Sequence, residues 1–179
     1  PGQLLRVVGA NGAGKTSLLR MLCGLLAPAH GQVLWQGQPI HKAREEFNRQ
    51  LLYLGHAAAL KDDLSPLENL QVALRLGGAA PDEAATSQAL ADAGLRGREH
   101  VPVRTLSQGQ RRRAALARLP LGHCALWVLD EPFNALDSAA TAWLLGQIET
   151  QLRRGGMVIL TSHQAVALGD AVPQVSLAL

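Results

Sequence analysis

GANGAGKT, residues 9–16, is the most informative stretch of the chain. It matches the pattern G-x-x-x-x-G-K-[ST], in which backbone N–H groups of a glycine-rich loop surround a phosphate, a lysine adds positive charge and a hydroxyl binds Mg²⁺. The apolar run at residues 4–8 predicts a strand before the loop, and residues 17–26 predict a helix after it. Since the phosphate-binding mechanism needs this strand-loop-helix context, it is favoured over an ordinary glycine-rich turn.

A second informative stretch, LWVLDE at residues 126–131, is an apolar strand that ends in two acids. In an open α/β sheet, ligands bind beyond the carboxyl ends of the strands, so these acids are expected at the same edge as the glycine loop. Asp130 is suited to hold Mg²⁺ through water, and Glu131 to polarise an attacking water molecule. Capping of a helix beyond Pro132 is the alternative. It is equally plausible in isolation and is disfavoured by the nearby phosphate loop.

The other apolar patterns predict an α/β fold with a mainly parallel sheet. Residues 125–129 and 157–160 are uninterrupted apolar runs, which are typical of parallel strands covered on both faces. Further strands are predicted at residues 32–36, before a turn at Gly37, and at residues 51–54. From residue 65 to about 119 the pattern is helical and rich in Ala and Leu. The chain therefore predicts strands joined by right-handed crossovers, with a helical insert.

Composition is that of an ordinary globular protein with one domain: 179 residues, of which 47% are hydrophobic and 17% charged. A net charge of +3, with scattered basic residues, gives weak support for nucleic acid as a partner. No apolar run reaches the roughly 18 to 20 residues of a membrane span. Cys23 and Cys124 are expected to be buried free thiols in a reducing compartment, without zinc. Pro1 leads almost directly into a strand without an initiating Met, so we expect an N-terminal piece to be missing.

The stretch RTLSQGQRRRAALARL at residues 104–119 admits three interpretations. Ser107 and Gln110 fit a capping box that starts a helix. The arginines at residues 111–113 could contact nucleic acid. The helix start around Ser107 and Gly109 could bind an anion through its bare N–H groups. The local sequence alone favours the capping box.

In this order, and with LSQGQ between the glycine loop and the acidic strand, these elements resemble the ATP-binding cassette (ABC) ATPase family over the whole chain. The resemblance implies a P-loop NTPase core with a mainly parallel sheet and an inserted α-helical subdomain, without the family's initial strand. It implies one ABC ATPase domain over residues 1–179. Residues 1–56 and 120–179 would form the ATP-binding core, and residues 57–119 would approximate the helical subdomain.

The resemblance also implies ATP and Mg²⁺ as cofactors and a set of site residues. Expected catalytic residues are Glu131, Lys15 and His163; His163 follows a core strand as a γ-phosphate sensor, although a lone histidine is more often structural. Nucleotide-binding residues are Gly9, Ala10, Asn11, Gly12, Ala13, Gly14, Lys15, Thr16 and Ser17. Metal contacts are Thr16, Asp130 and, as a further candidate, His56. The signature residues, acting on ATP held by an opposite subunit, are Leu106, Ser107, Gln108, Gly109 and Gln110. The D-loop is Asn134, Ala135, Leu136 and Asp137.

Two departures from the family pattern concern these residues. Gln108 replaces one glycine of the usual LSGGQ signature; because Ser107 and Gly109 remain, we expect phosphate binding to survive. His56 stands where most members have glutamine, and a plain loop histidine is as plausible there as a metal contact.

Within the family, residues 31–40, 51–70, 130–137 and 155–164 most resemble the ATP-binding subunit of the haem exporter of c-type cytochrome biogenesis. The function implied is MgATP hydrolysis for a membrane transporter. Its partners would be a second copy of the chain and integral-membrane permease subunits, with no nucleic acid expected. Its place would be peripheral, on the cytoplasmic face of the bacterial inner membrane. The alternatives are the ATPase of another small exporter, a soluble ABC ATPase acting on DNA or ribosomes, and a non-catalytic nucleotide-binding module.

Overall fold

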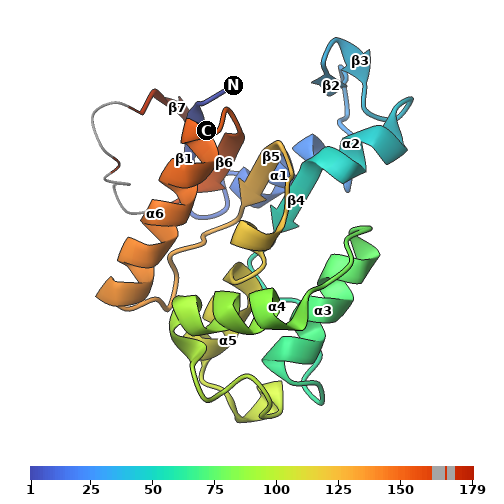
Figure 1. Ribbon diagram of the computed structural model, residues 1–179. Helices are drawn as coiled ribbons and strands as arrows, with labels where there is room; N and C mark the ends of the chain where they lie inside the picture. The colour runs from blue at the N-terminus through green and yellow to red at the C-terminus, as the bar shows by residue number, and fades with distance from the viewer. Residues whose placement is uncertain (163–167, 169–171) are drawn as a thin grey trace.

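A parallel sheet forms the centre of the computed structural model, which describes residues 1–162, 168 and 172–179 (Figure 1). Its strands lie in the order β4-β5-β6-β1-β7, and each neighbouring pair is parallel. The strands are β1 (Leu4–Val8), β4 (Leu51–Leu54), β5 (Leu126–Leu129), β6 (Met157–Thr161) and β7 (Gln174–Ala178). The predicted α/β class and parallel sheet are confirmed.

Helices cover both faces of this sheet, which explains why its central strands are apolar throughout. On one face Trp127 and Leu129 of β5 pack in a core with residues of α5 (Gln108–Leu116) and α6 (Ser138–Arg153). On the other face Leu126 and Val128 pack with residues of α1 (Lys15–Leu22) and α2 (Arg44–Gln50). All four residues of β5 are buried, so alternate side chains of one strand serve two cores.

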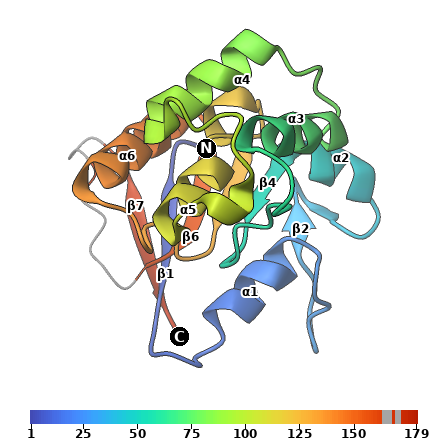
Figure 2. The ribbon, with the colours of Figure 1, turned by 90° about the horizontal axis from the view of Figure 1, so that it is seen from below.

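A group of helices lies beyond the sheet and has a core of its own. The group contains α3 (Pro66–Leu76), α4 (Glu83–Leu90), the π-helical turn η1 (Ala91–Leu95) and the 3₁₀ turns η2 (Val103–Thr105) and η3 (Leu119–Leu121). Figure 1 shows α3, α4 and α5 together below the sheet, and Figure 2 shows them from that side. Helix α5 belongs to both parts, because Ala114 joins the helical core whereas Ala115 and Leu116 join the sheet core.

Two predicted elements are shorter than expected. The helix predicted at residues 17–26 is α1, Lys15–Leu22, because Gly24 adopts φ 69° and the Leu25 N–H bonds back to the Arg20 carbonyl at 2.8 Å, which closes the helix. The strand predicted at residues 32–36 is reduced to β2 (Leu34–Trp35), paired with β3 (Gln38–Pro39). Gln36 and Gly37, with φ 51° and 80°, form the tight turn between them.

The two cysteines differ in their surroundings. Both are free, and Cys23 is buried as expected, with burial raising the pKa of its thiol to about 12. The expectation of burial is wrong for Cys124, which is only half-buried, since it lies in the connection that leads into β5. Among the described residues, no helix has both the length and the apolar character needed to cross a membrane.

Candidate active site

A pocket of about 560 Å³ opens at the carboxyl edge of the sheet, where the loops after β1, β4 and β5 meet. The pocket therefore joins the glycine loop to the acidic strand end, as the sequence predicted. Its lining residues are Asn11, Gly12, Gly14, Lys15, Thr16, Ser17, His56, Asp130, Glu131 and Asn134.

The glycine loop leads directly into α1, which begins at Lys15 and has no side chain capping its N-terminus. Gly12 and Gly14 have φ values of 83° and 96°, in the left-handed region that side chains disfavour. The Lys15 ammonium donates to the carbonyl oxygens of Gly9 and Ala10, at 2.8 and 3.1 Å. Bare helix N–H groups and a nearby cation make this loop suited to bind phosphate.

Asp130 is almost completely buried, with 1% of its surface exposed, and two threonines hold its carboxylate. The Thr16 hydroxyl donates to one carboxylate oxygen and the Thr161 hydroxyl to the other, each at 2.8 Å. Thr161 ends β6, the strand next to β5, and no role was predicted for it. The rule that placed Asp130 at the carboxyl edge of the sheet applies equally to the hydroxyl residue at the end of β6. A hydroxyl residue at the end of a predicted core strand is therefore the sequence signal that could have identified Thr161.

Glu131 lines the pocket and has a left-handed backbone, with φ 49°. For a residue other than glycine, such a conformation costs on the order of 1–3 kcal/mol and persists only where its surroundings enforce it. Here the Glu131 N–H donates to the Thr161 hydroxyl at 2.8 Å, and the Glu131 carbonyl accepts from Arg112 at 2.9 Å. Its backbone is therefore held on both sides.

The donor set at the pocket fits Mg²⁺. Mg²⁺ takes oxygen ligands and is usually bound by one or two protein groups together with phosphates and water. Thr16 Oγ1 and Asp130 Oδ2, 2.8 Å apart at the pocket, supply two such oxygens. The described part of the chain has no group of three or more His, Cys, Asp or Glu side chains that could hold a metal, and Mg²⁺ shared with phosphates does not require one.

A comparison with protein families identifies the chain. The family model described as "ABC transporter" matches residues 1–134. The chain belongs to the ABC transporter family. It is an ATP hydrolase of the ABC type, as its resemblance to the family implied.

Curated relatives and solved structures extend this result. Relatives named "Cytochrome c biogenesis ATP-binding export protein CcmA" are 54% identical in Methylococcus capsulatus, over 93% of this chain and 80% of the relative, and 56% identical in Aromatoleum aromaticum, over 92% and 77%. A putative ABC transporter ATP-binding protein from Pyrococcus furiosus shares the fold with a TM-score of 0.82 and 27% identity, over 98% of this chain and 84% of that one. A dimeric structure of MJ0796, a bacterial ABC transporter cassette, has a TM-score of 0.80 at 21% identity, over 91% and 75%, and supports the fold alone.

The predicted signature segment, residues 106–110, does not line the pocket of its own chain. Ser107 forms the predicted capping box of α5: its hydroxyl accepts from the Gln110 N–H at 3.2 Å, and its own N–H donates to the Gln110 side chain at 2.9 Å. Both Ser107 and Gln108 are exposed. Ser107 and Gln108 therefore lie at an exposed, capped helix N-terminus outside the pocket.

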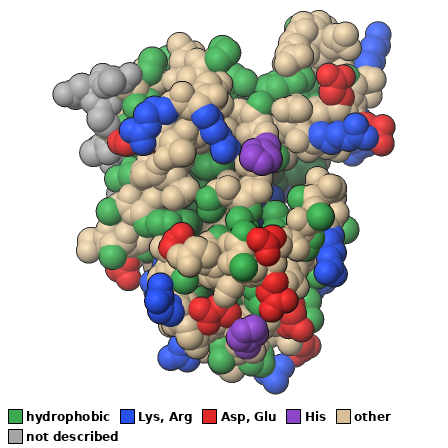
Figure 3. Space-filling model, in the orientation of Figure 1, with side chains coloured by type: hydrophobic (Ala, Val, Ile, Leu, Met, Phe, Trp, Pro, Cys, Tyr) green, Lys and Arg blue, Asp and Glu red, His purple; other side chains and the backbone are tan. Residues whose placement is uncertain are grey.

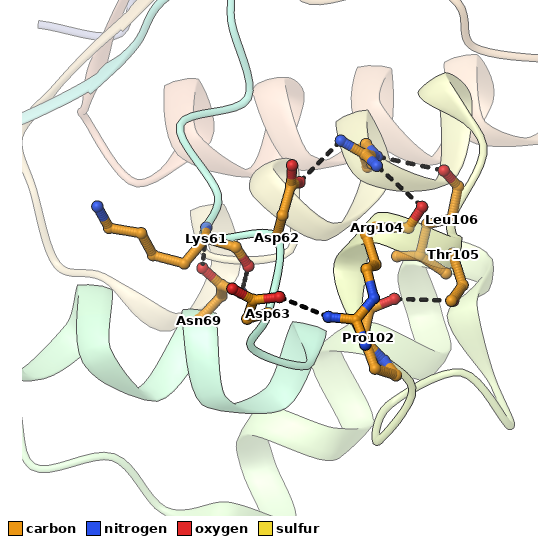
Figure 4. Close-up of polar contacts among 9 residues, drawn as sticks. Lys61, Asp62, Asp63, Asn69, Pro102, Arg104, Thr105 and Leu106 are labelled. Atoms are coloured by element: carbon orange, nitrogen blue, oxygen red, sulfur yellow. Dashed lines mark hydrogen bonds and ion pairs between the residues drawn. The ribbon is translucent and has the colours of Figure 1, made fainter.

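The arginine triplet does not form one exposed basic surface. Arg112 is buried, and Arg111 forms an ion pair with Asp62 at 2.9 Å. Figure 4 shows the neighbouring ion pair, in which Arg104 reaches Asp63 across the same two segments. On the face drawn in Figure 3, lysine and arginine side chains are scattered among acidic ones.

The predicted D-loop, residues 134–137, continues the turn that starts at Glu131. Asn134 lines the pocket, and Ala135 has a left-handed φ of 61°. Asp137 caps α6 by accepting from the Ala140 N–H at 2.8 Å. His56 reaches the pocket from the loop after β4, whereas the predicted sensor His163 lies outside the described residues.

Proposed function

We propose that the chain is the MgATP-hydrolysing subunit of a membrane exporter that serves c-type cytochrome biogenesis, with haem as the expected cargo. The names and 54–56% identity of the relatives described above support the export role. The observation that carries the catalytic part is the Asp130–Glu131 pair, held by hydrogen bonds at the phosphate loop. The location proposed is peripheral, on the cytoplasmic face of the bacterial inner membrane, beside integral-membrane permease subunits.

Each pocket residue has a proposed task in hydrolysis. Residues 9–17 bind the phosphates through backbone N–H groups, and Lys15 adds a positive charge near the β- and γ-phosphates. Thr16 and Asp130 hold Mg²⁺, which when bound neutralises charge on those phosphates. Glu131 orients the attacking water and accepts its proton. His163 is proposed as the γ-phosphate sensor and His56 as a further metal contact.

We propose that a second copy of the chain completes the site. The pocket contains no residue of the signature, whereas the exposed N-terminus of α5 offers N–H groups to an anion outside its own chain. A head-to-tail pair would place residues 106–110 of each copy against the ATP held by the other, with the D-loop, residues 134–137, near the contact. A cassette of the same fold has been solved as a dimer.

The domain division is also a proposal: residues 1–56 and 120–179 as the ATP-binding core and residues 57–119 as the helical subdomain. Its support is the separate hydrophobic core formed by α3, α4, η1 and part of α5. A helical part with its own core can shift as a unit relative to the sheet. Such a shift would carry the effect of ATP from the phosphate loop to the permease subunits.

The variant Glu131→Gln tests the catalytic proposal, because it keeps the size of the side chain and removes the base. We expect hydrolysis to fall by about 10²–10⁴-fold while ATP affinity stays the same, and ATP-bound dimers to accumulate. The control is Glu45→Gln, a change on the exposed surface of α2, which should leave both unaltered. Undiminished turnover in Glu131→Gln would remove Glu131 as the base.

The transport proposal is tested by isolating the protein from its native membranes in mild detergent. We expect integral-membrane proteins to co-purify with it, and the isolated complex to show ATPase activity. Recovery with nucleic acid or ribosomes, and without membrane proteins, would favour the soluble ABC ATPase instead.

A further inference from the structure

Arg112, in the second turn of α5, is a buried cation that the proposed mechanism does not use. Only 6% of its surface is exposed, and burial lowers the pKa of its guanidinium, while the carboxylates of Asp130 and Glu131 act in the opposite direction. Burying a charge is costly unless its hydrogen-bonding groups are satisfied. The surroundings of Arg112 must therefore offset this cost.

The guanidinium is surrounded by backbone carbonyl oxygens from two segments of the active site. Nη1 donates to Gly55 at 2.9 Å and to His56 at 3.3 Å, in the loop after β4. Nη2 donates to Asp130 at 2.8 Å and to Glu131 at 2.9 Å, and Nε approaches Pro132 at 3.4 Å. One planar side chain thus ties the loop that carries His56 to the acidic end of β5.

These contacts act on the strained part of the site. Glu131 has φ 49°, and its carbonyl is one of the oxygens that Arg112 holds. The first turn of α5 also lies against Ala135, the other left-handed residue of this segment: a Cβ at Gly109 would come within 2.6 Å of the Ala135 carbonyl oxygen. Helix α5 therefore contacts the backbone at both left-handed residues of the turn that carries Glu131.

The position of α5 is itself fixed on the other side. Arg111 donates to Asp62 at 2.9 Å and to the carbonyl oxygens of Leu106 and Arg104, and Arg104 pairs with Asp63 (Figure 4). The segment from Gly55 to Asp63 is consequently bonded to the signature helix and its preceding turn at several points. A shift of α5 would be transmitted to the Glu131 backbone through Arg112.

We propose that Arg112 is a positioning residue for hydrolysis: its guanidinium fixes the Glu131 backbone relative to the loop after β4 and to the signature helix of the same chain. The inference rests on the proposed role of Glu131 as the base. It gives the signature helix a second task, because its outer end faces a partner's ATP while its inner side holds the base of its own chain. Arg112 touches neither nucleotide nor water in this scheme.

The test compares Arg112→Ala with Arg118→Ala in the full-length protein. Arg118, just after α5, is the control: it is half-buried and donates to a strand carbonyl, that of Tyr53 at 3.2 Å, rather than to the turn that carries Glu131. We expect Arg112→Ala to lower kcat by about 10- to 100-fold, the effect of a misplaced catalytic group, with KM for MgATP changed by less than about threefold. Arg118→Ala should keep kcat within about threefold of wild type.

Added guanidinium ion provides a readout that a purely structural role would not give. Millimolar guanidinium should restore part of the kcat of Arg112→Ala in a saturable way, whereas urea, which has a similar shape without the charge, should not. Neither additive should raise the activity of wild type or Arg118→Ala. Absence of rescue, together with a kcat equal to that of Arg118→Ala, would overturn the inference.

A lysine variant covers the case in which Arg112→Ala does not fold. Arg112→Lys keeps the charge but lacks the planar fork, so it should fold and show a lowered kcat at unchanged ATP affinity. Wild-type kcat in Arg112→Lys, or unfolding of both variants, would overturn the inference, since Arg112 would then support the fold rather than Glu131. Failure of the proposed role of Glu131 is distinguishable, because Glu131→Gln would then hydrolyse ATP as fast as wild type.

Discussion

At the scale of single residues, the chemistry of this site depends on side chains that fix other groups. The Thr161 hydroxyl donates to the Asp130 carboxylate and accepts from the Glu131 N–H, so one buried oxygen fixes the position of the Asp130 side chain and of the Glu131 backbone. Asp130 is held a second time by Thr16. Each acid therefore has a defined place before nucleotide arrives, which is the preorganisation that electrostatic catalysis requires.

Replacing Thr161 by valine should lower kcat strongly and the free energy of unfolding modestly. Thr161→Val keeps the volume and leaves a buried carboxylate oxygen and a buried N–H without this partner, at a cost of about 1–3 kcal/mol in unfolding free energy. Because both acids lose a constraint, we expect kcat to fall at least about tenfold. Thr150→Val is the control, since its hydroxyl donates to Gly146 on the exposed part of α6. Urea unfolding and a coupled ATPase assay measure the two effects, and equal kcat values for both variants would contradict the expectation.

Cys23 gives the protein a predictable loss of stability in alkali. Burial raises the pKa of its thiol from 9.0 to about 12, so above pH 9 the unfolded chain releases a proton that the folded chain retains. The unfolded state is then favoured, and stability falls between pH 9 and pH 12 by about 1.4 kcal/mol per pH unit. The free energy of unfolding, measured in urea for wild type relative to Cys23→Ala, should drop by about this amount between pH 8 and pH 10. A constant difference would show that Cys23 does not titrate as its burial implies.

At the scale of elements, the segments with strong local patterns could be predicted from the sequence. Strands at residues 4–8 and 51–54 and the helical insert are confirmed, because two-sided burial demands continuous apolar runs and because α3 has a capping box at Ser65 followed by Pro66. The rule that ligands bind at the carboxyl ends of parallel strands predicted that the phosphate loop and the Asp130–Glu131 pair lie close together. These predictions needed no knowledge of distant contacts.

Other elements were missed for physical reasons. Strand β7 was missed although Val175 and Leu177 alternate with polar residues, because the run is short and exposed along its whole length; it pairs with the edge of β1. Helix α2 is short and polar apart from Phe47. The role of Arg112 depends on carbonyl groups from segments 18 to 57 residues away, and backbone acceptors have no sequence signature.

The signature helix allows its two tasks, capping and phosphate contact, to be separated at Ser107. Both Asn and Asp are good N-cap residues, so Ser107→Asn and Ser107→Asp should each keep α5 and change the unfolding free energy by less than about 1 kcal/mol. Only Asp places a negative charge where a partner's phosphate would bind. We expect Ser107→Asp to lose ATP-driven dimerisation and most hydrolysis, while Ser107→Asn retains more of both. Thermal melts and sedimentation with MgATP measure this, and identical behaviour of the two variants would limit Ser107 to capping.

At the scale of the whole molecule, the proposed head-to-tail pair divides the site between two copies of the chain. The pocket at the sheet edge is lined by the glycine loop and the acid pair, whereas none of residues 106–110, at the start of α5, lines it. Arg112, on α5, holds the backbone carbonyl of Glu131. In the proposed pair, a partner's phosphate at the N-terminus of α5 would therefore be linked to the position of Glu131.

Mixing two inactive variants tests whether the site is shared between copies. Lys15→Ala damages the phosphate loop and Ser107→Asp the signature, so each variant alone should hydrolyse ATP at a small fraction of the wild-type rate. A mixed head-to-tail dimer contains one site with an intact loop from one chain and an intact signature from the other. Because each mixed dimer has one intact site, activity should recover to roughly a quarter of wild type if the copies pair at random and the sites act independently. The recovery should rise with protein concentration, as expected for an associating pair. Substantial hydrolysis by Ser107→Asp alone, independent of concentration, would instead place the whole reaction within one chain.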